Sequence, residues 1–234
     1  RVIAPRDNVV LMLKFPYFEE KPTSKNRSGV IKYLTYVPFS QDLNYEEFIK
    51  SGGEYHQSVV QAAHDDLLTK NVKSRAVSGK LVAEVIPMDF VAPLPFLEQT
   101  DLAEMFITFD GAVERVLGNL GYNEQKAYVN TCNSMGACGW VQFTNRNGSG
   151  TYSTIVRKYP EAKLIRDFKT GAGDHVNSME AAMLLYDDNL ALLVKKFGSR
   201  ILEHPRLKEL LAAAYNGSPL RVVDALRKAQ TLQQ

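Results

Sequence analysis

The chain has 234 residues, of which 45% are hydrophobic and 23% are charged, values typical of a globular protein with a substantial core. The formal net charge of +2 is too small to indicate a nucleic-acid partner, although it is compatible with an anionic polymer. No run of the sequence approaches the roughly 18–20 consecutive apolar residues that span a bilayer, so we expect no integral membrane segment.

The first 50 residues are expected to form an irregular N-terminal extension. Two short segments, 9–13 and 31–37, are apolar or partly alternating and are β-like. A polar stretch, 20–28, lies between them and is typical of a loop. We therefore expect 1–50 to be an extension with short strands and 51–234 to be the principal domain.

From residue 46 onward, the spacing of apolar residues predicts helices joined by short loops. Gly121 and Gly198 are expected to end two of these helices, and Ser218 followed by Pro219 is a typical helix start. The helices are expected at 55–70, 78–86, within the proline-containing apolar run 88–99, and at 110–120, 152–159, 178–196, 205–215 and 218–229. The sequence thus predicts a mainly α fold.

The chain contains two cysteines, Cys132 and Cys138, and four histidines. A disulfide between these cysteines would close a very small loop, and the sequence alone does not decide between a disulfide and two free thiols. Two cysteines and four scattered histidines supply too few ligands for a zinc site. We therefore expect neither a metal nor a cofactor.

A small-residue turn at 134–139 runs into an apolar segment that contains one amide, Gln142. Gly136 and Gly139 are the first and last residues of its final four, 136–139. Because glycine has no side chain, the backbone there can closely approach either a ligand or another segment. Gln142 follows apolar residues, so we expect its amide to be partly buried and to need hydrogen-bond partners. Those partners are either backbone groups or the hydroxyl and acetamide groups of a sugar.

A second informative segment is 213–217, where a helix is expected to end on Tyr215, Asn216 and Gly217. Gly217 is expected to take the left-handed conformation that ends many helices, with Asn216 capping the last carbonyls. The alternative, functional interpretation directs the Tyr215 hydroxyl into a cleft beside an acid. Tyr152 either lines the same cleft or packs in the core.

Together, the two segments resemble the signatures of one family. Residues 136–143, Gly-Ala-Cys-Gly-Trp-Val-Gln-Phe, resemble the Gly-Ala-x-Gly-Leu-Met-Gln-Phe motif of soluble lytic transglycosylases, which have a lysozyme-like fold. Residues 213–219, Ala-Ala-Tyr-Asn-Gly-Ser-Pro, resemble that family's later Ala-Tyr-Asn-x-Gly helix end. The resemblance covers about 80–220, and it implies non-hydrolytic cleavage of the peptidoglycan bond between N-acetylmuramic acid and N-acetylglucosamine. Peptidoglycan lies outside the cytoplasmic membrane, so the periplasm or cell surface is implied, although no signal peptide is visible.

The resemblance requires a glutamate at a helix end upstream of the turn, usually followed by serine. Glu98 ends an apolar stretch like the family's lead-in, with Gln99 in place of the serine, but the gap to Gly136 is much longer than in the family. Glu124 has the usual spacing, but it follows an expected helix end and has polar neighbours. A general acid must be protonated near neutral pH, and apolar surroundings favour that state. We therefore expect Glu98 to be the acid and 101–132 to be an inserted helical segment.

The resemblance also implies the mechanism and the sugar contacts. Glu98 would protonate the glycosidic oxygen and then accept the proton of the muramyl C6 hydroxyl as that oxygen attacks C1, leaving a 1,6-anhydro sugar. Asn133 occupies a position where the family usually has serine. The residues expected to bind the glycan strand are Gln142, Tyr215, Asn216, Gly136 and Tyr152.

Two alternative functions stay open at this point. The first is a hydrolytic lysozyme of the same fold, in which Asp101 or Asp110 assists a water molecule. The second is a catalytically inactive lysozyme-like module that binds glycan, which the long gap after Glu98 and the missing Glu-Ser pair keep open. The products of peptidoglycan digestion distinguish these functions from a lytic transglycosylase.

Overall fold

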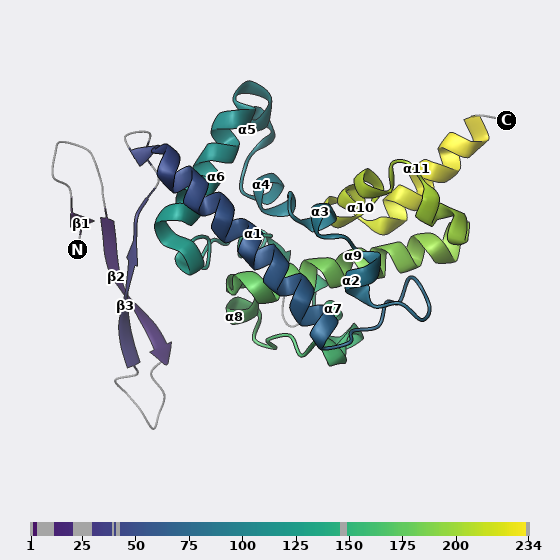
Figure 1. Ribbon diagram of the computed structural model, residues 1–234, viewed down its shortest axis with the longest axis horizontal. Coiled ribbons are helices and arrows are strands. Elements are labelled where there is room, and N and C mark those ends of the chain that lie inside the picture. Colours follow the sequence, from purple (N-terminus) through teal and green to yellow (C-terminus); the bar gives the residue numbers. More distant parts are fainter. Residues whose placement is uncertain are drawn as a thin grey trace. The chain divides into compact units, whose positions relative to one another are not determined.

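The computed structural model describes residues 2–3, 12–20, 30–38, 40, 43–145 and 149–232, most of which are helical (Figure 1). The predicted mainly α fold is therefore confirmed. The described chain divides into two compact units, one formed from 1–56 and 100–127 and the other from 57–99 and 128–234. The chain thus leaves the second unit after Gln99 and returns to it at Tyr128. The domain boundary expected near residue 50 stays a prediction.

The described N-terminal residues form a three-stranded antiparallel sheet in the order β1-β2-β3. Its strands are β1 (Val2–Ile3), β2 (Met12–Glu20) and β3 (Val30–Tyr36). β2 and β3 pair along most of their length, with an irregular register near the end of β2. The strand predicted at 31–37 is confirmed. Most of the segments 9–13 and 20–28 lies outside the described residues.

The sheet is attached to a helix of the same unit by two buried asparagines. Asn119 and Asn123 belong to α6 (Phe109–Asn123). The Tyr36 hydroxyl donates to Asn119 Oδ1 at 3.0 Å, and the amide of Asn123 exchanges two 2.8 Å hydrogen bonds with the backbone of Val37. Buried amides need such partners, so these contacts fix the end of β3 against α6.

Two glycines set the packing of α6 against the first turns of α1 (Glu46–Thr69). A Cβ at Gly52 would collide with the carbonyl of Leu117, and a Cβ at Gly121 would collide with the carbonyl of Phe48. Gly121 was expected to end its helix, and that prediction is wrong, because α6 continues beyond it to Asn123. Position 121 requires glycine because α1 and α6 approach each other closely there, and not because the chain reverses direction.

Replacing Gly52 by alanine is expected to destabilise the protein by about 2–3 kcal/mol, because the colliding atom is backbone and cannot move alone. Gly53 is the matched control, since no atom lies within 4 Å of a Cβ placed there. Gly53→Ala removes a helical glycine and should stabilise by about 0.5–1 kcal/mol. Urea unfolding of both variants measures the difference, and effects of equal sign would contradict the close approach.

The second unit is helical apart from a small pair of strands, β4 (Ala137–Cys138) and β5 (Phe143–Thr144). Its helices are α2 (Val82–Val85), α3 (Met88–Val91), α4 (Leu94–Glu98), α7 (Thr151–Lys158), α8 (Phe168–Gly173), α9 (His175–Phe197), α10 (Leu207–Asn216) and α11 (Pro219–Leu232), together with the later turns of α1. The long helix α9 packs against α2, α3, α7, α8, α10 and α11 and forms the centre of the core. Gly198 ends it, as predicted.

One predicted helix is much shorter in the structure. The helix expected at 78–86 is only α2, because Leu81 is extended, pairs with Lys73 and donates its backbone N–H to Glu84 Oε2 at 2.7 Å. The helix expected within the proline-containing run 88–99 is confirmed as α4, which begins directly after Pro93, and a further short helix, α3, precedes it. As predicted, α11 begins at Pro219, and the Ser218 hydroxyl accepts a 3.2 Å hydrogen bond from the backbone N–H of Leu220.

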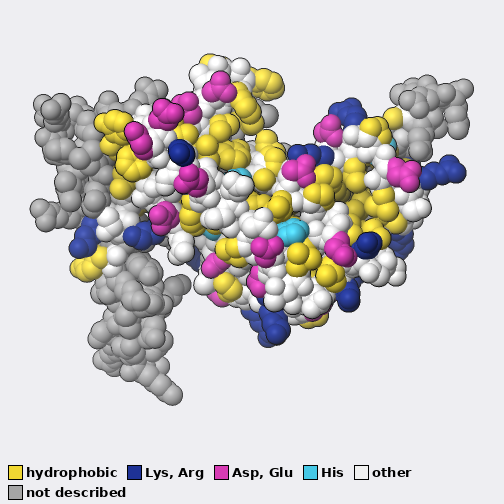
Figure 2. Space-filling view, viewed as in Figure 1, with side chains coloured by type: hydrophobic (Ala, Val, Ile, Leu, Met, Phe, Trp, Pro, Cys, Tyr) yellow, Lys and Arg dark blue, Asp and Glu magenta, His cyan; other side chains and the backbone are white. Residues whose placement is uncertain are grey.

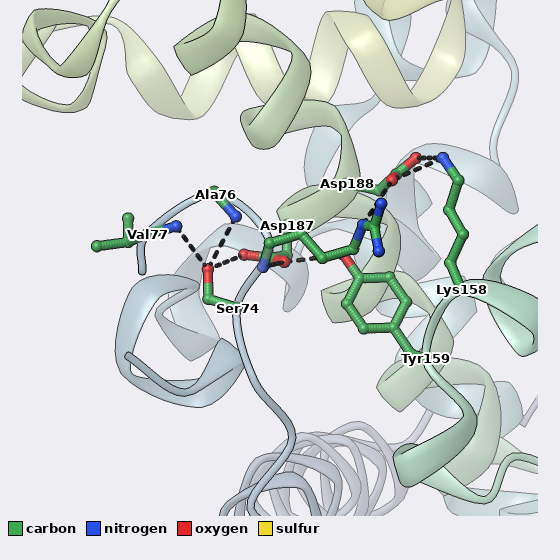
Figure 3. A network of polar contacts seen from close by, with 8 residues as sticks. Ser74, Ala76, Val77, Lys158, Tyr159, Asp187 and Asp188 are labelled. Carbon is green, nitrogen blue, oxygen red and sulfur yellow. Dashed lines mark hydrogen bonds and ion pairs between the residues drawn. The ribbon is translucent and has the colours of Figure 1, made fainter. Parts of the chain in front are cut away.

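A buried carboxylate on α9 holds the loop that precedes α2. Asp187 is fully buried and accepts hydrogen bonds from the Ser74 hydroxyl at 2.5 Å, the Arg75 backbone N–H at 2.7 Å and the Tyr159 hydroxyl at 2.8 Å (Figure 3). The Ser74 oxygen in turn accepts from the two backbone N–H groups of 76–77. A buried carboxylate with this many donors is stable, and it fixes the loop on the helix core.

The surface carries charges of both signs. On the face that Figure 2 shows, basic and acidic side chains are interspersed among apolar ones and form no continuous cationic area. In the part of the chain that the structure describes, no helix is both long enough and apolar enough to cross a membrane.

Candidate functional site

The turn that precedes Gln142 is closed by a disulfide between Cys132 and Cys138. The structure thus pairs the two cysteines that the sequence alone could not assign. The side-chain oxygen of Asn133 accepts hydrogen bonds from the backbone N–H groups of Met135 at 2.9 Å and Ala137 at 3.1 Å. The disulfide and this asparagine fix the shape of the turn.

The two glycines of the turn have different reasons to be glycine. Both have a positive φ, +81° at Gly136 and +78° at Gly139, which residues other than glycine rarely adopt. At Gly139 a Cβ would also collide with the carbonyl of Ala172 at the end of α8, so its close approach is to another segment of the chain. Nothing lies within 4 Å of a Cβ at Gly136. Gly136 therefore shapes the turn.

The amide of Gln142 binds the turn with its nitrogen. Gln142 itself has a φ of +50°, and its Nε2 donates to the carbonyl of Gly139 at 2.7 Å and, more weakly, to that of Thr131 at 3.4 Å. Among the described residues no group donates to its Oε1, so this oxygen is available to a ligand. The neighbouring Trp140 is fully buried, stacks on His175 and donates to the Ser178 hydroxyl, and it belongs to the core.

Glu98 is the last residue of α4, and its side chain is half-buried. This burial raises the pKa of Glu98 to about 7. The following residue, Gln99, donates from its Nε2 to the carbonyls of Gly139 at 3.1 Å and Trp140 at 2.9 Å. These two hydrogen bonds attach the helix of the glutamate to the turn across the long gap in sequence. In the sequence, Gln99 is recognisable only as a departure from the family motif, and no local signal indicates this contact.

A hollow of about 310 Å³ opens between α4, the turn, α7, α9 and α10. It brings together four of the residues expected to form the site, Glu98, Gln142, Tyr215 and Asn216. Its lining consists of Glu98, Asn133, Ala137, Gln142, Phe143, Thr144, Thr151, Leu185, Tyr215, Asn216 and Gly217. Among the described residues that line it, Glu98 is the one carboxylate. Gly136 is not part of this lining, because the turn presents the neighbouring Ala137 instead.

Two tyrosines pack beside the glutamate. The Tyr215 hydroxyl donates to the carbonyl of Val141 at 2.6 Å, which ties α10 to the segment after the turn. The ring of Tyr215 packs against that of Tyr186, whose buried hydroxyl has no hydrogen-bond partner among the described residues. Burial raises the pKa of both tyrosines, and the negative charge of Glu98 adds to the effect. Tyr186 was not among the residues expected to form the site.

Tyr152 was expected either to line the cleft or to pack in the core, and the structure confirms core packing. Its side chain is fully buried, and its hydroxyl donates to the carbonyl of Ile165 at 2.6 Å and accepts from Asn177 at 2.8 Å, so its place among the residues expected to bind the glycan strand is wrong. The left-handed conformation expected for Gly217 is wrong as well. Gly217 has a φ of −102° and is not left-handed. Its backbone N–H closes α10 by donating to Ala213, and the chain passes directly into the start of α11, so no left-handed residue is needed.

The alternative acids lie in the first unit and do not line the hollow. Glu124 is exposed at the end of α6 and has a φ of +46°. Asp101 caps α5 (Leu102–Ile107) by accepting the backbone N–H of Glu104 at 2.7 Å, and Asp110 is exposed in the first turn of α6. The structure thus groups Glu98, and not Glu124, with the residues of the two motifs.

Among the described residues, no group of three or more histidine, cysteine or acidic side chains is arranged to hold a metal ion. Comparisons of the chain with protein-family models, with curated proteins and with solved structures gave no match.

Proposed function

We propose that the chain is a lytic transglycosylase that cleaves the β-1,4 bond between N-acetylmuramic acid and N-acetylglucosamine in peptidoglycan. One observation supports this most strongly. A glutamic acid whose pKa is raised to about 7 shares one hollow with Gln142 and with Tyr215 and Asn216. These last three residues come from the two separate segments that resemble the family.

The reaction uses one carboxyl group twice. The protonated Glu98 gives its proton to the glycosidic oxygen, and the bond from C1 to that oxygen breaks with its electron pair moving to the leaving sugar. The Glu98 carboxylate then takes the proton of the muramyl C6 hydroxyl as the C6 oxygen forms its bond to C1. Hydrolytic glycosidases commonly need a second carboxylate, and the described lining of the hollow holds none besides Glu98. This favours the anhydro product over hydrolysis.

The polar side chains around the acid fit the groups of an amino sugar. The unpaired Oε1 of Gln142 accepts the N–H of an acetamide group, while its Nε2 stays bound to the turn. The exposed amide of Asn216 has both a donor and an acceptor for sugar hydroxyl groups. Tyr215 positions the wall of the site through its hydrogen bond to Val141.

Peptidoglycan is located outside the cytoplasmic membrane, and we propose the periplasm or the cell surface as the location of the protein. The disulfide between Cys132 and Cys138 supports this proposal, because disulfides persist in oxidising compartments.

Digestion of purified peptidoglycan followed by mass spectrometry of the soluble products tests the proposal. A lytic transglycosylase releases muropeptides that are one water lighter than the hydrolytic products and that resist reduction by borohydride. Reducible products would overturn the proposal in favour of a lysozyme. No products, together with retention of the protein on insoluble peptidoglycan, would overturn it in favour of an inactive glycan-binding module.

A further inference from the structure

Among the described residues, two more hollows continue the hollow of Glu98 along the second unit. The hollow next to it, of about 410 Å³, shares Thr144, Thr151 and Leu185 with it. A third hollow, of about 720 Å³, shares Asp188 with the second. Adjacent hollows have lining residues in common, so the three lie next to one another along α7 and α9, and together they are here called the α7–α9 groove.

The groove follows the two helices that name it. On α7 its lining advances from Thr151 to Lys158, and on α9 it advances from Leu185 to Lys195. At 1.5 Å per helical residue, these steps correspond to about 10–15 Å along the helices. The groove is therefore long enough for a ligand that extends well beyond the bond next to Glu98.

The chemistry of the groove changes along its length. Beside Glu98 it presents a carboxyl group and amides, and the middle hollow adds the hydroxyl groups of Ser149 and Thr154. The third hollow, here called the basic hollow, presents Arg75, Lys158 and Lys195 around the single carboxylate of Asp188. The apolar part of the basic hollow is formed by Ala76, Ala191, Leu192, Val194, Pro219 and Leu220.

The cations of the basic hollow exceed its carboxylate. Lys158 Nζ lies 2.6 Å from Asp188 (Figure 3), and Arg75 Nε lies 3.7 Å from the same side chain. Lys195 forms no ion pair among the described residues. The lining thus has three cations against one carboxylate, and the balance is still one positive charge when the buried carboxylate of Asp187 behind Arg75 is counted as well. The buried Asp187, through its bond to the Arg75 backbone, keeps this wall of the hollow in place.

We propose that the basic hollow binds the carboxylate groups of the peptide that peptidoglycan carries on its muramic acid, while the glycan lies beside Glu98. This inference rests on the proposed function. The occupant is an anionic peptide, because its carboxylates match the excess cations and its alanine side chains match the apolar part of the hollow. The middle hollow, which shares lining residues with both of the others, lies between this peptide site and the site of cleavage.

A binding measurement by calorimetry at low salt tests the inference. The probes are a disaccharide tetrapeptide with free carboxylates, the same compound with its carboxylates amidated, and the disaccharide without peptide. Lys195→Gln should weaken binding of the free-acid probe about two- to fivefold, the upper part of the range for one exposed ion pair, and leave the other two unchanged. Lys196→Gln is the matched control, since Lys196 is exposed on the same helix but does not line the hollow.

The outcomes separate this inference from the proposed function. If the wild type binds all three probes equally, or if Lys196→Gln weakens binding as much as Lys195→Gln, the inference is overturned even when anhydro products form. If the free-acid probe binds more tightly and depends on Lys195, the inference is supported. That result together with an absence of anhydro products would remove the proposed reaction and retain the peptide site.

Discussion

Glu98→Gln is expected to reduce peptidoglycan cleavage by about 100- to 10,000-fold, the range that a general acid contributes. The same substitution should stabilise the protein at alkaline pH. Burial raises the pKa of Glu98 from 4.5 to about 7, so the folded state holds a proton that the unfolded state loses between these values. Stability contributed by this group is therefore complete below pH 4.5 and is lost as the pH rises to 7, by about 3 kcal/mol. Glutamine does not ionise and avoids this loss.

Two measurements check this prediction. Urea unfolding at pH 4 and pH 9 should show similar stability of wild type and Glu98→Gln at the lower pH, and a more stable variant at the higher one. The kcat/KM of the wild type should fall as the pH rises through about 7, because the acid loses its proton. Glu124→Gln is the matched control and should change neither quantity. Loss of activity in Glu124→Gln alone would assign the acid to the first unit.

Gly139→Ala is expected to destabilise the protein by about 3 kcal/mol or more. The substitution places a Cβ on a residue with a φ of +78°, which costs about 1–2 kcal/mol, and drives it into the carbonyl of Ala172. Relief of this collision moves the backbone of residue 139, whose own carbonyl accepts hydrogen bonds from Gln99 and Gln142. The residue after Glu98 and the sugar-binding amide of Gln142 then both lose a hydrogen-bond partner. Activity should therefore fall even under conditions where the variant is folded.

Gly136→Ala is the control for Gly139→Ala. It has nearly the same φ but open space around its Cβ, so only the conformational cost of about 1–2 kcal/mol applies. Thermal unfolding and a peptidoglycan digestion assay on both variants measure the two effects. If Gly136→Ala were as damaging as Gly139→Ala, the contact with Ala172 would not be the reason for glycine at 139.

Long helices with many apolar residues and a clear stop signal were predictable from sequence, and α9 is the clearest example, because its apolar residues extend over several turns and Gly198 ends it. The reasons for individual glycines were not predictable. Gly121 resembles a helix end, yet it lies inside α6 against α1, and Gly217 resembles a left-handed terminator, yet it is right-handed. Both patterns are local, whereas the need for glycine at 121 depends on a helix that is distant in sequence.

In the candidate site too, residues in local motifs were predictable, whereas contacts between distant parts of the chain were not. Gln142, Tyr215 and Asn216 lie in short motifs, and the structure brings them together with the glutamate favoured from its apolar neighbours. The bridge from Gln99 to the turn spans 40 positions, and the chain's path through the first unit cannot be read from local spacing. For the same reason, the packing of Tyr186 beside the site could not be distinguished from ordinary core packing.

Glu98 and the α10 residues that line the same hollow are far apart in the sequence, and this separation has a consequence for synthesis on the ribosome. Glu98 is made early, whereas the tyrosine and asparagine of α10 are added more than one hundred residues later. At about 5–20 residues per second, the nascent chain carries the glutamate for on the order of 10 s before the last wall of the hollow exists. A chain that stops before α10 therefore contains the acid in surroundings that neither bury it nor hold a sugar beside it.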